Sequence, residues 1–112
     1  IFTQKFENFS MDELKEYGDF IRNKMPEGVA LIGSESNGKV LLVCIVGDDL
    51  LQKKMWDANA IISELTKTVG GGGGGRKHMA TAGIKGQNKI DDAFKVFKDV
   101  TELLYGNANV SN

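Results

Sequence analysis

The sequence predicts an α/β (α+β) fold in which a small mixed sheet with a central hairpin is covered by about three helices. Two observations carry this prediction: an Asn-Gly dipeptide between two apolar runs, and three stretches in which apolar residues recur at helical spacing. The length of 112 residues, with 41% hydrophobic and 26% charged residues, is typical of one folded domain. We therefore interpret residues 1–112 as a single domain.

The first helix is expected to begin directly after Ser10. Ser10 and Glu13 have the spacing of a capping box, and Phe9 and Leu14 have that of a hydrophobic staple. Pro26 ends the helix, because proline disfavours the α conformation of the residue before it. A short strand over residues 1–9 is expected to precede the helix. The apolar stripe of the helix comprises Leu14, Tyr17, Ile21 and Met25.

A β-hairpin is predicted over Val29–Ser36 and Lys39–Gly47, because Asn37-Gly38 between them tolerates the two positive φ angles of a type I′ turn. Residues 40–46 form an unbroken apolar run, which predicts a central strand that is covered on both faces.

Two further helices are expected around the sheet, over residues 57–68 and from residue 90 onward. Asn88 is the predicted N-cap of the last helix. Residues 78–84 lack helical periodicity and are expected to add another strand, so that a glycine-rich loop connects the second helix to this last strand. The two apolar stripes are Ala58, Ile61, Ile62 and Leu65, and Ile90, Ala93, Phe94, Phe97, Val100 and Leu104.

Charge is distributed unevenly along the chain, although the formal net charge is only −1. Residues 1–50 carry five basic and nine acidic residues, whereas residues 51–112 carry nine basic and six acidic ones. The segment Gly70–Ile90 contains four basic residues and no acidic residue. A polyanion is therefore expected to meet this segment.

Six consecutive glycines, residues 70–75, open the basic segment. A flexible linker is a poor explanation, because the residues after Gly75 are too few to fold alone. The Walker pattern fails, since Gly75 is followed by Arg-Lys-His, and a G-x-G-x-x-G match within a glycine homopolymer carries almost no information. Glycine N–H groups can converge on an anion, and Arg76 is the first choice for phosphate contact. The candidate nucleic-acid-binding residues are Gly70, Gly71, Gly73, Gly74, Gly75, Arg76, Lys77, His78 and Lys85.

No catalytic or metal-binding residues are assigned. His78 is the sole histidine, and Cys44 is the sole cysteine and lies within a buried strand, so a zinc set is not expected. Asp48 and Asp49 are interpreted as helix-entry or turn residues, and Trp56 as a packing residue. No apolar stretch is long enough to span a membrane and no signal peptide is recognised, so a cytoplasmic location is expected, with an organellar parent left open.

The string GGGGGGRKHMATAG from Gly70 onward resembles the motif G-G-x-G-G-G-R-x-x-M-A-x-A-G of the C-terminal, DHHA1-type domain of alanyl-tRNA synthetase. The order of capped helix, SESNGKV hairpin and second helix is similar to that family as well, so the resemblance covers nearly the whole chain. The family often has Lys at the position of Gly72.

The resemblance implies a tRNA-binding domain that contacts the outer corner of alanine-specific tRNA and helps the aminoacylation and editing domains to engage it. It implies no cofactor in this chain, since ATP, Mg²⁺ and any zinc would belong to other parts of the parent synthetase. Ile1 in place of an initiating Met is consistent with a fragment of a longer chain. The expected partners are tRNA and the remaining domains of the synthetase, with a homodimer left open and no membrane.

Two alternatives stay open at this point. One is the nucleic-acid-binding C-terminal domain of a DHH-type phosphodiesterase, whose glycine motif usually continues with His and a small-residue A-A-G. The other is a protein-interaction module in which the glycine segment has only a structural role.

Overall fold

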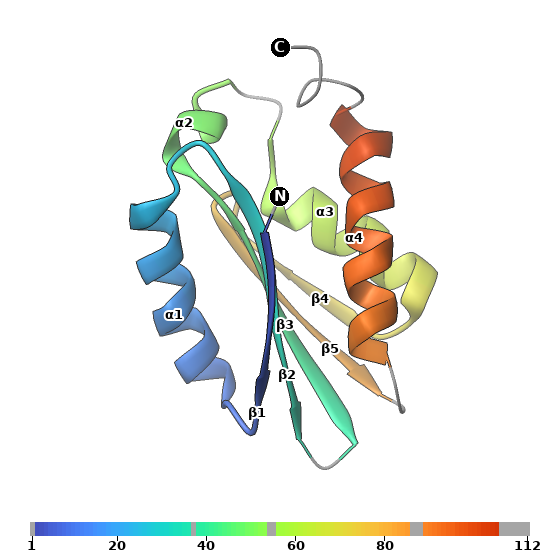
Figure 1. Cartoon of the computed structure of the whole chain (residues 1–112). Coiled ribbons are helices and arrows are strands. Elements are labelled where there is room, and N and C mark those ends of the chain that lie inside the picture. Colours follow the sequence, from blue (N-terminus) through green and yellow to red (C-terminus); the bar gives the residue numbers. More distant parts are fainter. Residues whose placement is uncertain (1, 37, 54–55, 86–88, 106–112) are drawn as a thin grey trace.

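The computed structural model describes residues 2–36, 38–53, 56–85 and 89–105 (Figure 1). Within these ranges there are one five-stranded sheet and four helices, which confirms the predicted mixed α+β fold. The elements are β1 (Phe2–Glu7), α1 (Met11–Lys24), β2 (Val29–Ser36), β3 (Lys39–Val46), α2 (Asp48–Leu51), α3 (Ala58–Val69), β4 (Gly72–Gly75), β5 (Met79–Lys85) and α4 (Lys89–Tyr105).

The sheet is mixed and has the strand order β1-β2-β3-β5-β4. β1 pairs with β2 in parallel, and the other pairs are antiparallel. β3 is therefore the central strand, as its apolar run predicted. Ser36 pairs with Lys39, so the hairpin closes through a two-residue turn. Gly38 has a φ of 77° in that turn, whereas Asn37 lies outside the described residues.

Two apolar layers form on opposite faces of the sheet, because successive side chains of a strand point to opposite sides. α1 covers one face, and α3 and α4 cover the other (Figure 1). The buried residues on the α1 side are Leu14, Ile21, Ala30, Ile32, Val43 and Ile45. Those on the opposite side include Leu31, Leu42, Cys44, Ile61, Leu65 and Phe97.

The predicted capping box is present at the start of α1. The Ser10 hydroxyl accepts from the Glu13 N–H at 3.1 Å, and the Glu13 carboxylate accepts from the Ser10 N–H at 2.8 Å. The helix ends at Lys24, two residues before Pro26. The capping box thus fixes the residue at which α1 begins, and the burial of Leu14 and Ile21 fixes the side of the helix that faces the sheet.

α3 and α4 also begin close to the predicted positions. Asp57 caps α3 by accepting from the N–H groups of Asn59 and Ala60. α4 starts at Lys89, and its predicted cap, Asn88, lies outside the described residues. Trp56 is buried, as expected for a packing residue, and its ring stacks on Tyr105 with the ring centroids 3.9 Å apart.

Asp48 and Asp49 form the first turn of the short helix α2, which confirms the helix-entry interpretation of these two residues. One feature differs from the sequence-based prediction. The glycine segment is not a loop throughout, because Gly72–Gly75 forms an edge strand on β5. The predicted strand near residues 78–84 is confirmed as β5.

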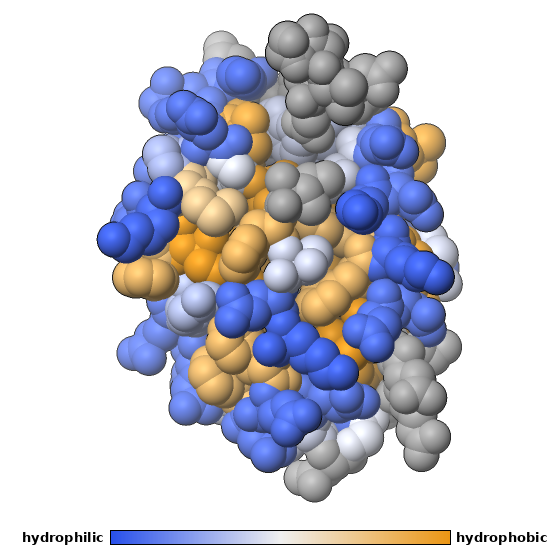
Figure 2. All heavy atoms as spheres, viewed as in Figure 1, coloured by the Kyte–Doolittle hydropathy of each residue, from blue (hydrophilic) through white to orange (hydrophobic). Residues whose placement is uncertain are grey.

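The opposite edge of the sheet, at β1, carries an aromatic cluster. Phe6 stacks on Phe9 at 4.3 Å and meets Tyr17 edge-on at 4.9 Å, measured between ring centroids. Seen from this edge, apolar surface extends between the more polar surfaces of α1 and α4 (Figure 2).

Candidate nucleic-acid interface

Close contact with β5 explains why β4 consists of glycine. A Cβ atom at Gly71 would overlap the carbonyl oxygen of Gly83 on β5, and one at Gly73 would overlap that of Thr81. A Cβ atom at Gly75 would lie 2.7 Å from the carbonyl oxygen of Met79. Gly71 also has a φ of 95°, a left-handed conformation that side chains disfavour. Side chains at these alternate positions would push β4 away from the sheet.

The other glycines of the segment have room. A Cβ atom at Gly70 or Gly72 would meet nothing within 4 Å, and one at Gly74 would meet only the Asn59 side-chain oxygen, at 3.2 Å. The exposed edge of the sheet is thus bare backbone that another chain can approach closely.

The backbone N–H groups of this segment do not converge as we expected for an anion-binding loop. The N–H of Gly70 donates to Thr66, that of Gly75 to the side-chain oxygen of Asn59, and that of Arg76 to the Met79 carbonyl. These three donors are used within the fold, and the side chains of the following turn offer further donors to an anion.

The turn from β4 to β5 presents those side chains on a fixed backbone. The Arg76 N–H donates to Met79 O at 2.9 Å and closes the turn. The Ala58 N–H at the start of α3 donates to Lys77 O at 2.8 Å, and the Val46 N–H at the end of β3 donates to His78 O at 3.0 Å. Arg76 and His78 are thus carried by a turn that is anchored to both neighbouring elements.

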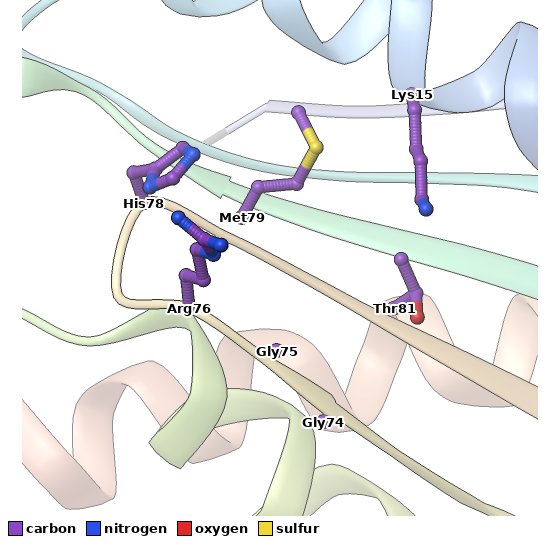
Figure 3. Close-up of a pocket in the computed structure, with 7 residues that line it drawn as sticks. All are labelled: Lys15, Gly74, Gly75, Arg76, His78, Met79 and Thr81. Atoms are coloured by element: carbon purple, nitrogen blue, oxygen red, sulfur yellow. The ribbon is translucent and has the colours of Figure 1, made fainter.

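An open pocket of about 290 Å³ lies beside this turn, on the face of the sheet that α1 covers. Its lining combines side chains from the turn with one from α1 and with two from β5 (Figure 3). The lining residues are Lys15, Gly74, Gly75, Arg76, His78, Met79 and Thr81. None of them is acidic, and no ion pair among the described residues involves Lys15 or Arg76.

The structure brings together only some of the predicted site residues. Gly74, Gly75, Arg76 and His78 line the pocket, and Lys77 is exposed on the adjoining turn. The remaining candidates lie further along the same edge. Gly70 and Gly71 lead from α3 into β4, and Gly73 lies in the middle of the strand.

Lys85 is at the far end of β5, where it pairs with Lys39, and its side chain lies outside the described part of the chain. At about 3.4 Å per residue, β5 places Lys85 roughly 20 Å from the turn. Lys85 therefore belongs to a different part of the surface from Arg76. Lys15, by contrast, was missed by the sequence reasoning, because it is remote from the glycine segment along the chain.

Other reactive groups of the described chain serve packing. Burial, with a smaller contribution from Asp57, raises the pKa of the Cys44 thiol far above its ordinary value of 9.0. Burial likewise raises the pKa of Tyr105, whose hydroxyl donates to Asp57 O and accepts from the Asp57 N–H. Within the described residues, no three His, Cys, Asp or Glu side chains gather as metal ligands would. None of the described helices is long and apolar enough to cross a membrane.

Comparison with known families gives a match to the DHHA1 domain over residues 1–103. The chain belongs to the DHHA1 domain family. The resemblance inferred from the glycine and arginine motif is thereby confirmed.

Curated relatives of this DHHA1 domain are alanine–tRNA ligases. The protein from Acetivibrio thermocellus is 44% identical over 102 residues, which are 91% of this chain and 12% of that protein. The one from Natranaerobius thermophilus is 38% identical over 91 residues, which are 81% of this chain and 10% of that protein. The chain thus spans about a tenth of the length of these relatives.

Two solved structures extend the comparison. The C-Ala domain of Aquifex aeolicus alanyl-tRNA synthetase superimposes with a TM-score of 0.78 at 30% identity, covering 88% of each chain. A DHH-domain protein described as a member of the s1p family of ribosomal proteins gives a TM-score of 0.57 at 16% identity, covering 87% of this chain and 23% of that one. The second similarity concerns the fold alone.

Proposed function

We propose that this DHHA1 domain is the tRNA-binding C-terminal domain of an alanine–tRNA ligase. In this role it contacts the outer corner of alanine-specific tRNA and helps the aminoacylation and editing domains to engage the same molecule. The similarity to alanine–tRNA ligases and to the C-Ala domain supports this proposal. Its proposed partners are tRNA and the remaining domains of the ligase, and its proposed location is the cytoplasm.

The observation that carries the proposal is the acid-free pocket beside the bare edge of β4. Phosphates dominate the affinity of proteins for nucleic acid, and Arg is suited to them because its planar group donates two parallel hydrogen bonds. Arg76 is exposed at the rim of this pocket, and the exposed Lys77 follows it. An RNA backbone can approach here because side chains are absent from β4.

We assign no catalysis to this chain. Its role is binding, and ATP, Mg²⁺ and any zinc are proposed to act in other parts of the ligase.

The outer-corner proposal is tested by comparing two RNA ligands of the 112-residue chain. Full-length alanine tRNA contains the outer corner, whereas a hairpin of the acceptor stem alone lacks it. We expect the full-length tRNA to bind the chain more tightly at every salt concentration, as measured by fluorescence anisotropy. Equal affinities would contradict an outer-corner site, and preference for a short single-stranded oligonucleotide would favour the phosphodiesterase-type alternative.

A further inference from the structure

We propose that Lys15 on α1 completes a binding site for one phosphate group of the RNA backbone, which Arg76, His78 and Thr81 hold from the other side. This inference rests on the proposed function and identifies how its pocket grips the RNA. It adds to the glycine motif a residue from a separate element of the fold.

The contact between α1 and β5 sets Lys15 above the pocket. Gly18 on α1 is buried, and a Cβ atom there would lie only 3.0 Å from the terminal methyl group of Met79. Lys15 precedes Gly18 by three residues and so shares its side of the helix. Thr81 follows Met79 by two residues and so points to the same face of β5. Figure 3 shows the Lys15 side chain extending from α1 toward Thr81.

The side chains around the pocket are complementary donors for a phosphate. Arg76 offers a planar pair of N–H groups, and Lys15 offers a compact ammonium with three rotatable donors. Further donors are the Thr81 hydroxyl, which lies opposite Lys15, and a ring nitrogen of His78, which lies beside Arg76 (Figure 3). Because Lys15 and Arg76 belong to different elements, they reach a phosphate from two directions.

The distribution of charge on α1 restricts the path of the RNA. Asp12, Glu16 and Asp19 are exposed on this helix, and none of them lines the pocket. Like charges repel the phosphates from the outer surface of α1. Lys15 is thus a basic position at the margin of an acidic helix, on the side that faces the pocket. The RNA backbone is directed over β5 and the bare edge of β4.

The test compares Lys15→Ala with Lys24→Ala. Both variants remove one exposed positive charge from α1, but Lys24 lies over the ring of Phe20, 5.5 Å from its centroid, and does not line the pocket. Binding of alanine tRNA is measured across a salt series. We expect Lys15→Ala to weaken binding roughly three- to ten-fold. The slope of log affinity against log salt should fall by less than about one, because Arg76 still contacts the same phosphate. Lys24→Ala should stay within about two-fold of the wild type, because Lys24 lies nine residues further along α1, roughly 13 Å from Lys15 and beyond the Debye length at physiological salt.

Lys15→Arg supplies the conservative variant and should restore most of the affinity. The double variant Lys15→Ala/Arg76→Ala should lose less affinity than the two single losses combined, because both residues hold the same phosphate.

If Lys15→Ala binds like the wild type while Arg76→Ala binds weakly, the inference is wrong and the proposed function stands. If the wild-type chain does not bind tRNA, both are wrong. Equal losses of affinity in Lys15→Ala and Lys24→Ala would show that Lys15 acts only through the overall charge of α1, and would overturn the inference.

Discussion

The six glycines at 70–75 are not equivalent residues. Gly71, Gly73 and Gly75 lie so close to β5 that a side chain would collide with its backbone, whereas Gly70 and Gly72 face open space. The sequence alone could not separate these two sets, because the inner residues Gly71–Gly74 all have glycine on either side. The distinction arises only from the pairing of β4 with β5.

Gly73→Ala and Gly72→Ala form a matched pair for this distinction. We expect Gly73→Ala to lower the free energy of unfolding by about 1–3 kcal/mol, because its Cβ atom must displace β4 from Thr81 and Ala82. Gly72→Ala should stay within about 0.5 kcal/mol of the wild type, because its Cβ atom meets nothing within 4 Å. Urea unfolding measures both free energies. Similar losses of stability in the two variants would contradict the close contact of Gly73 with β5.

Gly72→Lys is expected to increase affinity for tRNA. The position is open and exposed, so a lysine there adds a positive charge beside the proposed path of the RNA without disturbing β4. The slope of log affinity against log salt should steepen by about one. The same titration of Gly72→Gln controls for the added bulk. A Gly72→Lys variant with unchanged affinity and slope would show that RNA does not pass along β4.

At the level of the elements, local signals explain what could be predicted. Ser10 and Glu13 mark the start of α1, and Asn37-Gly38 marks the hairpin, because each signal acts within a few residues. β4 had no such signal, since glycine is a poor strand former and its strand depends on contact with β5. Lys15 was missed for the same reason, because only the packing of Gly18 on Met79 brings α1 to the pocket.

The hairpin provides a prediction that separates stability from binding. Gly38 has a φ of 77°, so Gly38→Ala should destabilise the fold by about 1–2 kcal/mol. Lys39 next to this turn pairs with Lys85, at the end of β5 opposite to Met79 and the pocket. Affinity for tRNA per folded molecule should therefore be unchanged. Thermal unfolding and anisotropy measured on the same samples check both parts, and an affinity loss without loss of stability would place the turn within the interface.

At the scale of the whole molecule, the net charge of −1 conceals two separate surfaces. Acidic residues occupy the exposed surface of α1, and basic residues surround the turn from β4 to β5. The sequence already indicated this division, because its first half is acidic and residues 70–90 contain no acidic residue. Folding then adds Lys15, a basic residue from the acidic half, to the basic surface.

The most direct test of the central claim is a salt titration of tRNA binding with the wild-type chain, Arg76→Ala and Lys77→Ala. Thermal unfolding of each variant serves as the folding control. The wild type should bind tRNA, and Arg76→Ala should weaken binding and reduce the slope of log affinity against log salt by about one. Lys77→Ala should have a smaller effect, because Lys77 lies outside the pocket and lacks the planar donor pair. If Arg76→Ala binds tRNA like the wild type at every salt concentration, the turn between β4 and β5 is not the binding site.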